Sequence, residues 1–278
     1  MDKNTHLPFL LDMLRQLALI PSPTGMTAGI EHHLKDSLKE IGLTPWQTRK
    51  GAVLAKLSEG SGDGILLSSH IDTLGLMVRA VKANGRLRVT QLGGFPLQYA
   101  EQENVLVHTR DGKTIPGTLR MNQPAVHANK DLRTAERNDE SMEIVLDMRV
   151  SDKEGCHALG VSAGDYISLD PRFVFSADGF IKSRHMDDKA SAAVLITLAR
   201  AFASGSASCR SSSRRDLWSV SRIRISTSPA MTRPATPIIS TGPAVPGSGP
   251  GTGSAIFWNS SSGCAGSTPI RSARSCLR

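Results

Sequence analysis

The sequence has few cysteines and no long apolar run. Its 278 residues include four Cys, none of them in a C-x-x-C pair, so we expect neither a disulfide framework nor a thiolate zinc site. The longest apolar candidate, residues 7–20, is interrupted by polar side chains and falls short of the roughly 18 residues that a membrane span needs. The N-terminus also lacks the basic region and apolar core of a secretory signal. These absences predict a cytoplasmic protein without a membrane partner.

The excess of positive over negative charge lies in the last quarter of the chain. The formal net charge is +8, from 33 Lys and Arg against 25 Asp and Glu. Nine Arg but only one acid lie in residues 204–278, which leaves 24 residues of each sign in residues 1–203. Proteins that bind nucleic acid usually carry a basic surface on the folded domain. Because residues 1–203 are charge-balanced, nucleic acid is not expected as a partner.

Residues 204–278 also lack Lys, Glu and Tyr, and they contain 19 Ser. We find no sustained helical or strand periodicity there, so we predict no fold for this tail, because it buries too little apolar surface to offset its ordering entropy. Scattered Trp and Phe side chains are unlike those of a polar linker. We therefore interpret the tail as an out-of-frame translation product, and the alternative is a genuine disordered Ser- and Arg-rich tail.

The remaining 203 residues contain helical and strand patterns in an order typical of a layered α/β domain. Apolar spacing predicts helices over residues 7–20, from Thr27 to about residue 41, and after Asp187. Short apolar runs at residues 52–57 and 64–69 predict strands, the second of them buried on both faces. We assign residues 1–75 and 176–203 to one α/β domain.

Residues 76–175 differ in character and predict a mainly antiparallel β unit inserted into that domain. They contain six strand-length runs and no helix-length period. The dipeptides Asn84-Gly85 and Asp111-Gly112 are strong hairpin signals. We expect a barrel or a sandwich.

Two groups of polar residues are candidates for chemistry. His70 and Asp72 follow the buried strand, at the type of sheet edge where ligands gather, and Asp72 could hold the second ring nitrogen of a metal-bound His70. Asp187 and Asp188 begin the later helix, where a carboxylate can bridge two cations. Each group has an alternative explanation. The histidine could be a hydrogen-bonded core residue, and the acids could cap the helix.

The order of these pieces resembles the M42 family of metallo-aminopeptidases. Five segments carry the resemblance: residues 21–25 (PSPTG), 69–78 (SHIDTLGLMV), 126–131 (VHANKD), 142–147 (MEIVLD) and 179–191 (GFIKSRHMDDKAS). The resemblance covers roughly residues 5–203. It implies an α/β catalytic domain of the phosphorylase/hydrolase-like zinc-peptidase type, with a PDZ-like β domain inserted for oligomerisation. It also implies a cytosolic enzyme that assembles as dimers and up to dodecamers.

The resemblance further implies a site that binds two divalent ions, zinc or cobalt and sometimes manganese, and removes N-terminal residues from peptide substrates. His70 matches the first metal ligand of the family, Asp72 the acid that orients it, and Asp187 the carboxylate that bridges the metals. Asp188 matches the neighbouring acid, which is not usually a ligand. In that mechanism a metal-activated water attacks the peptide carbonyl, and a Glu acts as general base.

The sequence departs from the family pattern after the helix that follows Asp187. No Glu occurs after Glu154, no His occurs after His185, and Asp216 is the only acid after Asp188. The general base and three of the expected ligands are therefore missing. We predict an inactive relative of an M42 aminopeptidase. The alternatives are a non-catalytic self-associating fragment and a pseudogene product.

Overall fold

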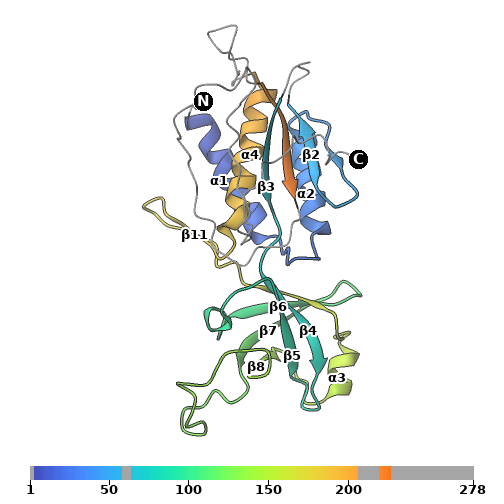
Figure 1. The fold of residues 1–278 in the computed structure, drawn as a ribbon, viewed down its shortest axis with the longest axis vertical. Coiled ribbons are helices and arrows are strands. Elements are labelled where there is room, and N and C mark those ends of the chain that lie inside the picture. Colours follow the sequence, from blue (N-terminus) through green and yellow to red (C-terminus); the bar gives the residue numbers. More distant parts are fainter. Residues whose placement is uncertain (1–2, 58–63, 206–218, 227–278) are drawn as a thin grey trace, which may run out of the picture.

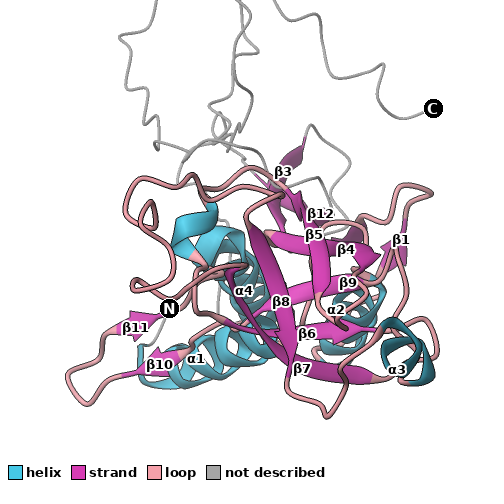
Figure 2. Cartoon of the chain, turned by 90° about the horizontal axis from the view of Figure 1, so that it is seen from below, coloured by secondary structure: helices cyan, strands magenta, loops and turns pink. Residues whose placement is uncertain are grey.

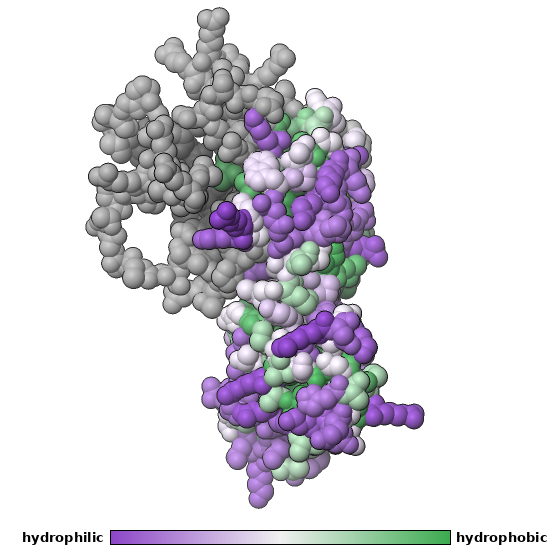
Figure 3. Space-filling model, turned by 90° about the vertical axis from the view of Figure 1, so that its right-hand side faces the viewer, coloured by the Kyte–Doolittle hydropathy of each residue, from purple (hydrophilic) through white to green (hydrophobic). Residues whose placement is uncertain are grey.

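The computed structural model describes residues 3–57, 64–205 and 219–226, which fold into an α/β part and a β-barrel (Figure 1). Figure 3 shows a narrower waist between the two parts. Within the described residues, no helix is both long and apolar enough to span a membrane. The helices are α1 Lys3–Leu19, α2 Ala28–Glu40, α3 Lys153–Ala158 and α4 Met186–Ala203, with a short 3₁₀ turn at Leu97–Tyr99.

The α/β part is built on a four-stranded sheet in the order β1-β2-β12-β3. Helix α4 packs against β3 and α1, as its closely spaced small residues predict. The predicted helices and strands of this part are confirmed in position, although α1 begins four residues before the expected start. The expected burial of the strand at residues 64–69 on both faces is wrong, because Leu66 is 48% exposed. The strands are β1 Trp46–Gln47, β2 Val53–Lys56, β3 Gly64–His70 and β12 Ser219–Ser226.

Strand β12 corrects one expectation. We predicted no regular element within residues 204–278, and this is wrong for residues 219–226, which pair antiparallel with β2 and parallel with β3. The four residues from Arg222 to Ile225 alternate Arg and Ile, a strand period too short to stand out in a Ser-rich segment. A strand between β2 and β3 satisfies backbone groups on both of its edges. The rest of the tail, residues 206–218 and 227–278, lies outside the described residues.

The predicted β unit is a closed six-stranded barrel in the order β4-β5-β8-β7-β6-β9 (Figure 2). Asn84-Gly85 and Asp111-Gly112 form the turns between β4 and β5 and between β6 and β7, as expected. Closure removes the unpaired edges that a sandwich would leave. The strands are β4 Gly75–Val81, β5 Leu87–Leu92, β6 Asn104–His108, β7 Thr114–Met121, β8 Met142–Leu146 and β9 Tyr166–Leu169.

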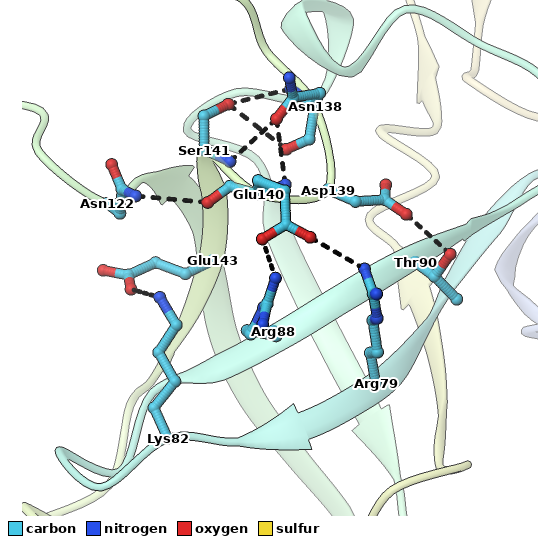
Figure 4. A network of polar contacts seen from close by, with 10 residues as sticks. All are labelled: Arg79, Lys82, Arg88, Thr90, Asn122, Asn138, Asp139, Glu140, Ser141 and Glu143. Atoms are coloured by element: carbon cyan, nitrogen blue, oxygen red, sulfur yellow. Dashed lines mark hydrogen bonds and ion pairs between the residues drawn. The ribbon is translucent and has the colours of Figure 1, made fainter.

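The barrel has its own hydrophobic core, separate from the two apolar clusters of the α/β part. Figure 4 shows the buried carboxylate of Glu143 accepting a hydrogen bond from Lys82, and the exposed Glu140 paired with Arg79 and Arg88. Glu143 also accepts a hydrogen bond from Arg86. A short ribbon of β10 Val174–Phe175 and β11 Ile181–Lys182 leads from the barrel back to α4.

Candidate metal-binding site

The structure brings His70 and Asp187 into contact at the junction of β3 and α4. His70 is the last residue of β3, and its Nε2 lies 3.1 Å from Asp187 Oδ1, across 117 residues of sequence. As expected from the sequence, Asp187 lies in the first turn of a helix, α4, and its side chain is 74% exposed. The packing of α4 on β3 therefore decides that the two side chains meet.

Asp72 fixes the other side of the His70 ring. Its Oδ1 lies 3.1 Å from His70 Nδ1, and its side chain is fully buried. Its Oδ2 accepts a hydrogen bond of 2.8 Å from the Thr24 hydroxyl, so both carboxylate oxygens have partners. The expected placement of Asp72 beside the second ring nitrogen is what the structure shows.

His70 and Asp187 each stabilise the charged form of the other. Burial alone would lower the pKa of His70, but its hydrogen bonds to Asp187 and Asp72 outweigh this effect and raise the pKa to about 10. The hydrogen bond from His70 in turn lowers the pKa of Asp187. At neutral pH the His70 ring is therefore an imidazolium paired with Asp187.

Asp188 contacts the backbone at the end of β3. Its Oδ2 accepts a bond of 3.4 Å from the His70 N–H, and its side chain is largely buried. Burial raises its pKa, against the opposing effects of Ser191 and His70.

Two partners of the site were not identified from the sequence. Thr24 and Lys189 lie in two of the segments that carry the family resemblance, but the sequence assigned neither of them a role. Lys189 is fully buried and its Nζ donates a bond of 2.7 Å to the carbonyl of Ile20. Burial lowers its pKa to about 7. The sequence could not show these contacts, because each joins groups that lie far apart along the chain.

The residues present do not complete a two-metal centre. Across residues 3–57, 64–205 and 219–226, no three His, Cys, Asp or Glu side chains are arranged to hold a metal ion. His70 and Asp187 supply two donors, whereas a single zinc takes three protein ligands or more. Both ring nitrogens of His70 already face carboxylates. The described part of the chain therefore provides only a fraction of the expected site.

Comparison with known proteins identifies the family. A family model described as "M42 glutamyl aminopeptidase" matches residues 51–211, which is more than half of the chain. The chain belongs to the M42 family. This family consists of metal-dependent aminopeptidases, which are peptide hydrolases.

Individual M42 relatives match over a similar range. "Putative aminopeptidase YhfE" of Bacillus subtilis is 41% identical over 189 residues, covering 68% of this chain and 55% of the relative. The glutamyl aminopeptidase of Lactococcus lactis is 26% identical over 172 residues, covering 61% of this chain and 48% of the relative. The chain thus spans about half the length of the curated relatives it matches.

Solved structures agree on the fold. A TET aminopeptidase from a marine sediment archaeon, Thaumarchaeota archaeon SCGC AB-539-E09, superposes with a TM-score of 0.66 at 20% identity, over 77% of this chain and 57% of that chain. The PhTET1-12s structure, described as a dodecamer, gives a TM-score of 0.61 at 19% identity, over 77% of this chain and 58% of that chain. This M42 chain therefore combines the mixed α/β fold of TET aminopeptidases with a six-stranded barrel.

Proposed function

We propose that residues 1–203 descend from the first part of a cytoplasmic M42 metallo-aminopeptidase that cleaves N-terminal residues from peptides, and that the 278-residue chain itself is inactive. The observation that carries this proposal is the geometry of His70, Asp72 and Asp187. These residues match family positions and converge within hydrogen-bonding distance, yet no third ligand joins them among the described residues.

In this proposal the roles of the residues follow from their contacts. His70 and Asp187 are the two metal ligands that the chain retains, Asp72 holds the His70 ring in position, and Asp188 supports the backbone beside it. Zinc, cobalt and manganese all suit an imidazole and a carboxylate, and each would supply Lewis-acid chemistry in a complete site. No Glu follows Glu154, so the chain has no residue for the general base at the expected place.

An assay tests this proposal directly. The purified chain, supplied with cobalt or zinc, is offered an aminoacyl-p-nitroanilide, with the glutamyl aminopeptidase of Lactococcus lactis as the active control. We expect release of p-nitroaniline at the rate of a blank that contains only metal. Turnover clearly above that blank, and lost in His70→Gln, would show that the chain is an enzyme.

We also propose that residues 204–278 are translated out of frame. The family match ends at residue 211, near the point where the composition changes, and this supports the proposal. The nucleotide sequence provides the test. A shift of one or two bases near codon 203 should reveal a Glu-Glu pair and a later His, whereas incoherent sequence in both other frames would contradict the proposal.

A second candidate function is non-catalytic. The closed barrel, with its own buried core, favours a PDZ-like self-association unit at residues 76–175 that works without the catalytic centre. Solved relatives form large assemblies, such as the dodecamer of PhTET1-12s. Size-exclusion chromatography with light scattering, with and without an intact relative, tests this function. Dimers or mixed assemblies are expected, and a monomer at all concentrations would contradict it.

A further inference from the structure

The turn at residues 20–25 connects the two halves of the candidate site. It follows α1, lies against the end of β3, and reaches both Asp72 and Lys189. Resting on the proposed function, we propose that Thr24 is a positioning residue, which sets the orientation of the His70 ring by holding the carboxylate of Asp72.

The Thr24 hydroxyl lies within hydrogen-bonding distance of the Asp72 carboxylate. This hydroxyl has one proton and two acceptors within reach, Asp72 Oδ2 at 2.8 Å and the Thr73 carbonyl at 3.4 Å. The shorter contact is to a charged oxygen, which makes it the stronger hydrogen bond. The carboxylate plane is thus defined at one oxygen by Thr24 and at the other by His70 Nδ1, 3.1 Å away.

The turn is held in place independently of the Thr24 side chain. The Ser22 hydroxyl donates to the Ile71 carbonyl at 2.7 Å, and the Thr73 N–H donates to the Ser22 carbonyl at 2.8 Å. The Thr24 N–H donates to the Thr73 carbonyl at 3.1 Å. These bonds align the turn with residues 71–73, so the Thr24 hydroxyl has little freedom to move away from Asp72.

A hydrogen bond from α4 holds the start of the turn at Ile20. Buried Lys189 donates to the Ile20 carbonyl at 2.7 Å, and it lies two residues after Asp187. One end of the turn is therefore bonded to α4, the helix that carries Asp187, and the other end is bonded to Asp72, the acid that contacts His70. One six-residue segment sets the relative position of the two groups that meet across the site.

Close contacts with the barrel also restrict the position of the turn. A Cβ at Gly75 would lie 2.6 Å from Pro23 Cβ and 2.9 Å from the Ile167 carbonyl, so the turn approaches the start of the barrel as closely as glycine allows. Gly25 has φ +97°, and a Cβ there would lie 2.6 Å from Tyr166 Oη. The turn is thus confined from the barrel side as well.

The experiment uses the full metal-free chain with ¹⁵N-labelled histidine, observed by NMR at one fixed pH. The ring signals of His70 are assigned with His70→Gln. We expect Thr24→Val, which removes only the hydroxyl donor, to shift the Nδ1–H signal of His70, and Thr24→Ser, which keeps the donor, to restore it.

Thr27→Val is the matched control, because the Thr27 hydroxyl donates to a carboxylate, Glu31 Oε1 at 2.7 Å, without a link to Asp72. It should leave the His70 signals unchanged even if it lowers the melting temperature. Unchanged His70 signals in Thr24→Val, or equal shifts in Thr27→Val, would overturn the proposal. If Thr24→Val does not fold, Thr24→Ala carries the same expectation. Because no metal or turnover is involved, the result is independent of whether the chain is an enzyme.

Discussion

His70 Nε2 and Asp187 Oδ1 lie 3.1 Å apart and form an ion pair in which each residue stabilises the charge of the other. The resemblance to the M42 family implies that these two residues are metal ligands. Both ring nitrogens of His70 lie 3.1 Å from a carboxylate oxygen, one of Asp72 and one of Asp187. A cation bound at Nε2 would take the place of the hydrogen bond to Asp187.

Metal retention should be weak. After incubation with excess cobalt and gel filtration, we expect less than one bound metal per chain by elemental analysis, because two ligands do not hold a zinc- or cobalt-type centre against water. His70→Gln should change this value little. Two equivalents of metal per chain, lost in His70→Gln, would mean that ligands outside the described residues complete the site.

Gly75→Ala should destabilise the fold by about 1–3 kcal/mol, the usual cost of overpacking a close backbone contact. The added methyl would meet Pro23 and the Ile167 carbonyl, and neither can move without shifting the turn or the barrel. Gly29→Ala in α2 is the matched control, since nothing lies within 4 Å of its added methyl. The control should stabilise the helix by about 0.5–1 kcal/mol. Equal midpoints in urea for both variants would disprove the steric account.

Glu143→Ala should lower the free energy of unfolding by about 2–3 kcal/mol. The Glu143 side chain is 1% exposed and accepts bonds from Lys82 and Arg86, so its loss leaves a partly buried cluster of like charges. Glu140→Ala tests the same chemistry at a 64% exposed side chain, paired with Arg79 and Arg88, and should cost less than about 1 kcal/mol. Chemical denaturation measures both, and a larger cost for Glu140→Ala would contradict the burial argument.

Stability should fall as the pH drops below about 6.5, the ordinary pKa of histidine. Burial lowers the pKa of His108, so between its folded and unfolded pKa values the unfolded chain binds more protons. The free energy of unfolding then rises with pH in that window. His185, with a pKa lowered to about 4, mainly by burial, acts in the same direction.

Urea titrations at several pH values measure this dependence. His108→Gln should reduce the slope without abolishing it, since His185 remains. His127→Gln, at an exposed position, should keep the wild-type slope. An identical slope in His108→Gln would show that His108 is not the source of the dependence.

Much of the fold was predictable because its signals are local. Leu and Ile spacing marked α1 and α2, the small residues after Asp187 marked α4, and the Asn-Gly and Asp-Gly pairs marked two hairpins of the barrel. Such patterns depend only on the helix and strand periods. Strand β12 escaped notice because a four-residue alternation becomes a strand only when two neighbouring edges, β2 and β3, are available to pair with it.

The family, most of the order of elements and the residue types at the candidate site follow from the sequence alone, since His70, Asp72 and Asp187 belong to local motifs. The missing general base is also evident without coordinates, because no Glu follows Glu154. The contacts of His70 with Asp187, of Thr24 with Asp72 and of Lys189 with Ile20 depend on the tertiary packing. Those contacts join residues 48 to 169 positions apart, and only the packing of α1, α4 and β3 sets such distances.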